Sequence, residues 1–326
     1  MSKKTVQNTF FVLGVLAIIY LIYSFDLSWS MLIESMKEVG LYFPIAFVLW
    51  LFIYGINTCS WAQIVKGVSK RLISFGSLFK FTVSGFAINY ITPGGLMGGE
   101  PYRILKLKSY IGTSAASSST LIYLICHIGS HFLFWLFAIF YLLVNPLEGI
   151  SRGVLLIIGT LLSLFLFVFH LLLRKGFVES LGNVVKRLPI LRRNTQRVER
   201  LTANFKLIDS ELSSFYLEGK QFLKALTLEF VARLIGCLEI WLLLIPFVGF
   251  SSFADSFLIV AVSSLFANML FFLPMQLGGR EGGFALAFSL LGLPAAYGVV
   301  IALLIRIREL MWIVVGVVLI KTKDSQ

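Results

Sequence analysis

The sequence has little charge for its length. Asp, Glu, Lys and Arg make up 13% of its 326 residues, whereas a soluble domain carries about 25%. Apolar residues make up 58% of the chain, and the mean hydropathy is +0.90. One water-soluble core cannot bury that much apolar surface, so a soluble enzyme and a disordered protein are both excluded. Apolar runs of about 20 residues recur along the chain, which predicts an all-α, polytopic membrane protein.

Cysteine and histidine are scarce, with three residues of each. Cys59, Cys126 and Cys237 are too few and too scattered for a disulfide framework or a cysteine-rich metal site, so we interpret them as small buried hydrophobes. His127 and His131 have a spacing that can bind zinc, but no His-Glu-x-x-His pattern and no third ligand accompanies them. We therefore predict hydrogen-bonding or packing histidines, and no metal, cofactor or catalytic residue.

The net charge of +12 suggests a nucleic-acid partner at first sight, but its distribution argues against one. Most basic residues fall in short loops between apolar segments, as the positive-inside rule and anionic lipid headgroups require. Full-length apolar segments occupy about 10–25, 41–62, 115–144, 152–173, 222–249 and 296–320. The predicted partners are therefore membrane lipids, with anionic headgroups at the cytoplasmic face, and no nucleic acid.

The basic loops also predict the orientation. Lys3 and Lys4, the segment 174–221, and Lys321 near the C-terminus should all be cytoplasmic, which places both termini on that side of a cytoplasmic (inner) membrane. The segment 174–221 carries apolar residues at helical spacing among its basic residues. This pattern predicts an amphipathic helix that lies on the anionic membrane surface.

Two other apolar stretches, about 77–111 and 257–291, are interrupted by Pro and Gly and resemble each other. Pro, Leu, Gly and Glu recur at the same positions of an eight-residue motif, which runs from Pro93 to Glu100 and from Pro274 to Glu281. An Asn precedes each motif and a Gly-x-x-Ala-Ala follows it, so that the repeats cover 89–116 and 268–296.

The loop charges place the two interrupted stretches on opposite sides of the membrane. We therefore predict a single domain over 1–321, with about six full spans and two re-entrant hairpins arranged as an inverted repeat. Eight spans is the alternative, if each hairpin crosses fully. Paired Pro/Gly-broken segments in two such halves indicate a transporter's substrate site, because non-helical backbone at membrane depth must line a polar cavity or pack in protein.

Nine charged residues remain at membrane depth once the loops are assigned: Glu100, Glu229, Arg233, Glu239, Arg280, Glu281, Arg306, Arg308 and Glu309. Each costs several kcal/mol unless it faces a cavity or a partner. Glu229 and Arg233 are spaced as an ion pair on one helix. Glu100 and Glu281 recur beside the Gly-rich breaks, which favours a functional role for both. The candidate substrate-binding residues are Asn89, Pro93, Gly94, Gly98, Gly99, Glu100, Arg103, Asn268, Pro274, Gly278, Gly279, Glu281 and Arg306.

These two motifs resemble those of the lysylphosphatidylglycerol synthase transmembrane region, also called the flippase-like domain or UPF0104 group. The resemblance covers about 10–320. In the bifunctional multiple peptide resistance factor, a domain of this kind is thought to flip aminoacylated phosphatidylglycerol, which a soluble C-terminal domain makes. The present chain ends soon after its last span, so we expect no aminoacyl transfer from it. It also has Cys126 or His127 where the second repeat has Arg306, which disfavours a symmetric two-arginine headgroup clamp.

The sequence thus favours translocation of a lipid or lipid-linked headgroup. Two alternatives stay open. One is a membrane-embedded transferase that acts on a lipid or a polyprenyl phosphate, with Glu100 as its base. The other is a non-catalytic partner of a separate lipid-synthesising enzyme.

Overall fold

The computed structural model describes residues 29–92, 98–175, 195–250, 252–269 and 279–322. These residues form helices and contain no strand, so the all-α prediction is confirmed. In chain order the helices are α2 (Trp29–Val39), α3 (Tyr42–Ser69), α4 (Phe75–Ile91), α5 (Gly99–Ile111), α6 (Thr113–Val144), α7 (Arg152–Lys175), α9 (Thr195–Leu217), α10 (Lys220–Val248), α11 (Phe253–Met269), α12 (Gly279–Leu290) and α13 (Ala295–Lys321).

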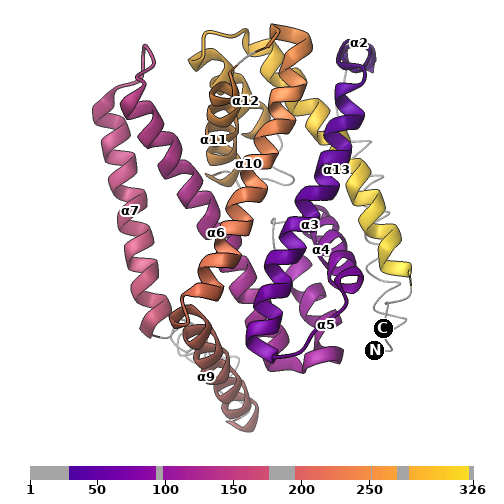
Figure 1. The fold of residues 1–326 in the computed structure, drawn as a ribbon, viewed down its shortest axis with the longest axis vertical. Helices are drawn as coiled ribbons and strands as arrows, with labels where there is room; N and C mark the ends of the chain where they lie inside the picture. Colours follow the sequence, from indigo (N-terminus) through magenta and orange to yellow (C-terminus); the bar gives the residue numbers. More distant parts are fainter. Residues whose placement is uncertain (1–28, 93–97, 176–194, 251, 270–278, 323–326) are drawn as a thin grey trace.

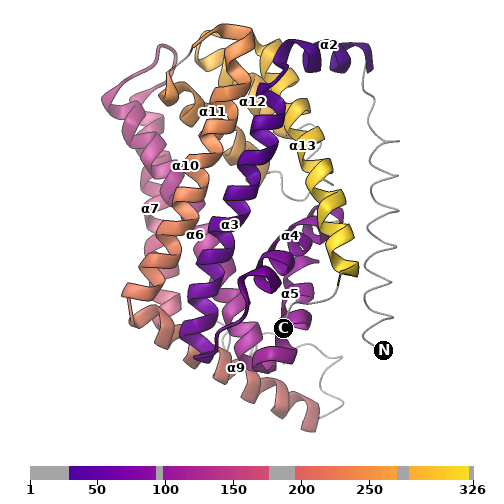
Figure 2. The ribbon, with the colours of Figure 1, turned by 45° about the vertical axis from the view of Figure 1, so that its right-hand side comes forward.

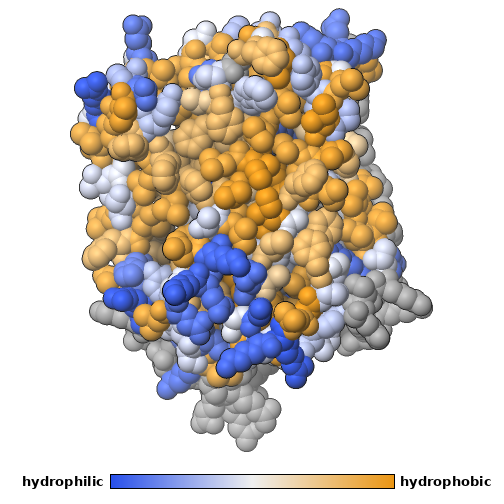
Figure 3. Space-filling view, in the orientation of Figure 1, coloured by the Kyte–Doolittle hydropathy of each residue, from blue (hydrophilic) through white to orange (hydrophobic). Residues whose placement is uncertain are grey.

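Four of these helices, α3, α6, α7 and α10, are long and apolar enough to cross a membrane. They match four of the predicted spans, and the chain is a multi-pass membrane protein. The predicted span 296–320 is the 27-residue helix α13, which differs by carrying Arg306, Arg308 and Glu309, all buried. The predicted span 10–25 lies outside the described residues. Apolar side chains cover the middle of the face shown in Figure 3, and hydrophilic ones gather toward its ends.

The helices follow the same order twice. A long helix, two short helices and a second long helix occur as α3–α4–α5–α6 and again as α10–α11–α12–α13. The two helix pairs occupy opposite halves of the molecule, α4 and α5 in the lower half and α11 and α12 in the upper half of Figures 1 and 2. This arrangement is the one that the repeated motifs predict. Whether the pairs are re-entrant, and the number of full spans, stay predictions.

The first break has a local cause. Thr92 precedes Pro93, which disfavours helix at that position, and its backbone is extended (φ −78°, ψ 124°). Pro101 lies in the first turn of α5, where its missing N–H leaves no helical bond unmade. At the start of α5, a Cβ on Gly99 would lie 2.2 Å from the carbonyl oxygen of Gly85. Glycine at position 99 therefore lets α5 approach α4 directly.

The basic segment is only partly as predicted. Its described part is α9, a helix with apolar residues at helical spacing, and 176–194 lie outside the described residues. Leu212 and Phe215 are buried in a cluster with side chains of α3, α5, α6 and α10. The second half of α9 therefore packs on the helix bundle, and its position at the membrane surface stays a prediction.

Candidate functional site

A cavity of about 400 Å³ lies within the bundle. Every helix that lines it belongs to one of the two repeats, α3–α6 or α10–α13. Its charged lining consists of four carboxylates and four guanidinium groups: Glu100, Glu229, Glu239 and Glu309, and Arg103, Arg233, Arg280 and Arg308. The cavity therefore holds an equal number of fixed positive and negative groups inside an otherwise apolar body.

Asn89 organises the first break from the end of α4. Its side-chain oxygen accepts a hydrogen bond from the Gly99 backbone N–H at 2.6 Å, and its Nδ2 donates to Glu100 Oε1 at 2.9 Å. One amide thus holds both the first N–H of α5 and the carboxylate next to it. The second oxygen of Glu100, Oε2, is buried and has no hydrogen-bond partner among the described residues. Glu100 is therefore fixed by one oxygen and has the other unused.

Arg103 lies one turn further along α5 and is only 6% exposed. It donates to the Thr82 carbonyl at 3.3 Å and contacts Glu100 Oε1 at 3.5 Å. Its guanidinium also lies over the rings of Tyr123, at 5.1 Å, and Trp61, at 5.8 Å. These contacts offset the cost of burying the charge. Arg103 is thus a buried residue of the cavity wall.

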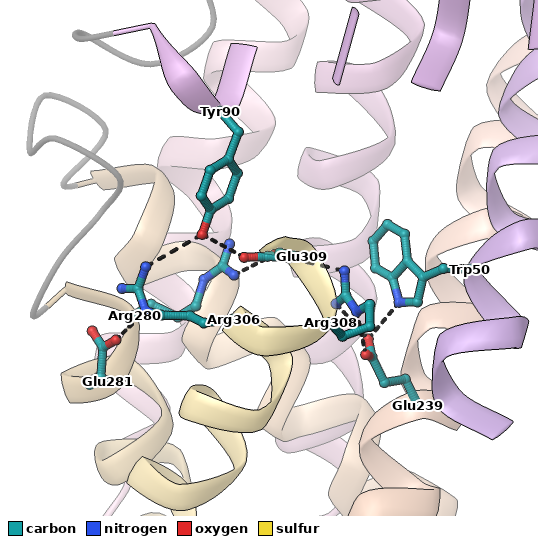
Figure 4. Close-up of polar contacts among 8 residues, drawn as sticks. All are labelled: Trp50, Tyr90, Glu239, Arg280, Glu281, Arg306, Arg308 and Glu309. Carbon is teal, nitrogen blue, oxygen red and sulfur yellow. Dashed lines mark hydrogen bonds and ion pairs between the residues drawn. The ribbon is translucent and has the colours of Figure 1, made fainter. Parts of the chain in front are cut away.

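Arg280, at the start of α12, lies beside the second break. Its NH1 is 2.5 Å from Glu309 Oε1, and Tyr90 donates its hydroxyl to Glu309 Oε2 at 2.6 Å (Figure 4). Tyr90 belongs to α4 of the first repeat, whereas Arg280 and Glu309 belong to the second. This cluster therefore connects the two repeats next to both breaks.

Arg306 and Glu281 form an ion pair with each other, and Arg306 also donates to the Tyr90 hydroxyl at 3.4 Å. Arg306 is 2% exposed, and neither residue is part of the cavity lining. Arg306 nevertheless contacts Tyr90, which lines the cavity, and Glu281 directly follows Arg280, which also lines it. The pair thus supports the cavity wall at the second break.

Arg308 and Glu239 form a doubly hydrogen-bonded ion pair in the cavity wall. Two bonds join them, Nε to Oε1 at 2.7 Å and NH2 to Oε2 at 2.9 Å. Trp50 of α3 donates to the same carboxylate at 2.8 Å, and the Arg308 guanidinium lies 3.8 Å from the centre of the Trp50 ring. Three helices, α3, α10 and α13, therefore meet at one carboxylate.

The predicted ion pair between Glu229 and Arg233 of α10 is wrong, because each residue bonds to α6 instead. Glu229 Oε2 lies 2.7 Å from His127 Nδ1 of α6. Arg233 instead donates to Ser130 Oγ at 2.6 Å, to His131 Nδ1 at 2.9 Å and to the His127 carbonyl at 2.8 Å. Helical spacing brought the two charges near one face, but α6 supplies better aligned partners. Both histidines make hydrogen bonds, as predicted. The described residues contain no group of three His, Cys, Asp or Glu side chains placed to hold a metal ion.

The predicted site residues separate into three groups. Asn89, Glu100, Arg103 and Asn268 line the one cavity, although they come from both repeats. Gly98, Gly99, Gly279, Glu281 and Arg306 support it at the starts of α5 and α12 and on α13. Pro93, Gly94, Pro274 and Gly278 lie outside the described residues. Sequence reasoning missed Trp50, Tyr90 and His127 as cavity residues. Only helical position relative to the repeated breaks could have marked them.

Comparison with known proteins agrees with the repeat-based analysis. Residues 11–317 match the family model described as the lysylphosphatidylglycerol synthase TM region. The chain is also 24% identical over 312 residues to a UPF0104 membrane protein of Methanocaldococcus jannaschii, an alignment that covers 94% of this chain and 90% of the relative. The family match includes both breaks and reaches into every helix that lines the cavity. The chain therefore belongs to the family of lysylphosphatidylglycerol synthase transmembrane regions, as its two motifs predict.

Proposed function

We propose that this protein translocates a lipid headgroup across the cytoplasmic membrane through the cavity between its two repeats. The observation that carries the proposal is a cavity of about 400 Å³ with eight charged residues in its wall, surrounded by helices that expose many apolar side chains. That volume lies in the range of about 300–1,000 Å³ typical of small-ligand sites. It suits a headgroup, while the acyl chains remain in the bilayer.

The charged lining supports transport over a purely structural role. A charge at the bilayer centre costs about 2.5–3.5 kcal/mol on insertion scales. Ion pairing would satisfy these residues without any cavity, yet eight of them surround an open volume. Two buried oxygens at its wall, Glu100 Oε2 and Asn57 Oδ1, have no partner among the described residues. A small movement of either side chain toward the cavity would let its oxygen accept a hydrogen bond from an amine or hydroxyl of a headgroup.

The arrangement of the breaks supports alternating access. The two broken helix pairs come from opposite halves of the molecule, and both contribute to the same cavity. In transporters with inverted repeats, rocking of one repeat against the other opens a central site to each side in turn. The same movement here would expose a headgroup alternately to the two membrane faces, with both termini of the chain cytoplasmic.

The family name directs the choice of substrates to test. Lysylphosphatidylglycerol is a phospholipid whose headgroup carries both a phosphate and amines, and the cavity has equal numbers of carboxylates and guanidinium groups. The lipid panel should therefore include aminoacylated phosphatidylglycerol, plain phosphatidylglycerol, a glycolipid and a polyprenyl phosphate. The protein's partners in this proposal are membrane lipids, including anionic headgroups at the cytoplasmic face, and a separate enzyme that makes the transported lipid.

Translocation of headgroup-labelled lipids in proteoliposomes tests the proposal. We expect movement with the wild type and its loss in both Glu100→Gln and Glu281→Gln. Glu148→Gln is the matched control, because Glu148 is exposed in the loop between α6 and α7 and should retain full activity. Retained movement in both test variants would exclude this pocket. No movement with any lipid of the panel would exclude translocation and favour the transferase or the non-catalytic partner.

A further inference from the structure

One titratable pair in the cavity has no part in the headgroup contacts proposed above. His127 Nδ1 and Glu229 Oε2 are 2.7 Å apart. The Glu229 side chain is 1% exposed, and its second oxygen, Oε1, has no hydrogen-bond partner among the described residues. The His127 side chain is 37% exposed and lines the cavity. A carboxylate with a vacant acceptor thus touches an imidazole that solvent in the cavity can reach.

The pair also joins the two repeats. His127 lies on α6, the last helix of the first repeat, and Glu229 lies on α10, the first helix of the second. A proton added to the imidazole would give it a positive charge and strengthen its attraction to the carboxylate. Protonation of the pair therefore alters a contact between the two repeats, which must move against each other during alternating access.

Other charged groups are present around the pair, but they have their own partners. Arg233, one turn from Glu229, donates to Ser130, His131 and the His127 carbonyl. Glu239 and Arg308 pair with each other across α10 and α13, and Glu309 pairs with Arg280 of α12. The remaining titratable or charged cavity residues near the pair are Tyr54 of α3, Glu100 and Arg103 of α5, and Tyr123 and His131 of α6, with Cys126 of α6 behind them. The described parts of α2, α7, α9 and α11 contribute no charged or titratable side chain to the cavity lining.

We propose that the His127–Glu229 pair is a proton-binding site, and that lipid translocation is coupled to its protonation. This inference rests on the proposed function. Imidazole is the side-chain group that proteins most often use to bind and release a proton, and here it faces the cavity while a buried carboxylate touches its Nδ1. Water in the cavity would carry the proton to and from the exposed imidazole.

Nuclear magnetic resonance of the imidazole nitrogens tests proton binding without any transport. The chain has three histidines, so ¹⁵N-histidine labelling gives a simple spectrum if the purification tag contains none. The variants His127→Gln, His131→Gln and His170→Gln assign the signals. We expect the His127 signal to depend on pH, and this dependence to change in Glu229→Gln. His170, which bonds to Tyr216 outside the cavity, is the internal control and should titrate identically in both proteins. A His127 signal that does not titrate, or one that Glu229→Gln leaves unchanged, overturns the proposal.

Proteoliposome transport at a series of symmetric pH values tests the coupling. We expect the wild-type rate of lipid translocation to change several-fold over the pH range in which the His127 signal changes. In His127→Gln and Glu229→Gln, that rate should no longer depend on pH in this range. The control His170→Gln should keep the wild-type profile. A wild-type rate that is independent of pH overturns the coupling while leaving translocation intact. Absence of wild-type movement with every lipid overturns the proposed function and this coupling together, and is thereby distinguished from the previous outcome.

Discussion

Arg308 of α13 and Glu239 of α10 are joined by two hydrogen bonds inside the bundle, and their side chains are only 3% and 4% exposed. Paired ions at this depth are stabilising only while both are present, because each has given up its hydration. Trp50 adds a third bond to the carboxylate. The pair therefore fixes α10 and α13, the outer helices of the second repeat, relative to α3 of the first.

Removing one member of this pair should destabilise the protein strongly. We expect Arg308→Met or Glu239→Leu alone to lower the free energy of unfolding by about 3–5 kcal/mol, because the remaining buried charge loses its two hydrogen bonds to the partner. The double variant should recover most of that loss, since it buries no unpaired charge. Thermal unfolding of the detergent-purified proteins measures all three. Equal losses in the double variant and the single variants would mean that packing, and not charge pairing, sets the stability here.

Gly99 should tolerate no side chain. A Cβ there would lie 2.2 Å from the Gly85 carbonyl oxygen, which is backbone and cannot turn aside. We expect Gly99→Ala to separate α5 from α4, break the Asn89 bond to the Gly99 N–H, and lower both stability and translocation. Gly55→Ala is the control, because a Cβ at Gly55 meets nothing within 4 Å inside α3. That change should raise helix stability by about 1 kcal/mol at most. Thermal unfolding compares Gly99→Ala with Gly55→Ala. Equal stability of the two variants would contradict the close approach of α5 to α4.

The Asn89 side chain accepts one hydrogen bond and donates another. Two substitutions distinguish the contributions of these bonds. Asn89→Asp keeps an acceptor for the Gly99 N–H but places a second carboxylate beside Glu100. Asn89→Leu removes both bonds and should cost about 1.5–3 kcal/mol, as expected for a bond to a charged group. We expect both variants to lose translocation and stability, Asn89→Leu because both hydrogen bonds are lost and Asn89→Asp because two buried carboxylates repel each other. Asn145→Asp, at the exposed end of α6, should change neither. Full activity in Asn89→Asp would show that its bond to Glu100 is dispensable.

Much of the architecture follows from composition and from one repeated motif. Long apolar runs predicted α3, α6, α7 and α10, and the Pro and Gly clusters predicted the two broken helix pairs. These signals are local, because span length and helix breaking depend on a few neighbouring residues. The same motif pointed to Asn89, Glu100 and Asn268, which line one cavity.

The ion pairing could not be predicted in the same way. Spacing along α10 suggested Glu229 with Arg233, but the partner of Glu229 is His127, 102 residues away in the chain. Which carboxylate meets which cation depends on how α6 rotates against α10, and a single sequence carries no direct signal of that. The packing of Leu212 and Phe215 of α9 on the bundle could not be predicted for a related reason. An apolar stripe at helical spacing looks the same whether lipid or protein covers it.

Leu212 distinguishes these two environments for α9. The side chain is 2% exposed and packs in the cluster formed with α3, α5, α6 and α10. We expect Leu212→Ala to lower the free energy of unfolding by about 2–5 kcal/mol, the usual cost of a core leucine. Leu207 on the same helix is 47% exposed, so Leu207→Ala should have little effect on stability in detergent. Thermal unfolding compares the pair. If instead Leu207→Ala and Leu212→Ala both left stability unchanged and reduced binding to anionic vesicles, α9 would be a membrane-surface helix after all.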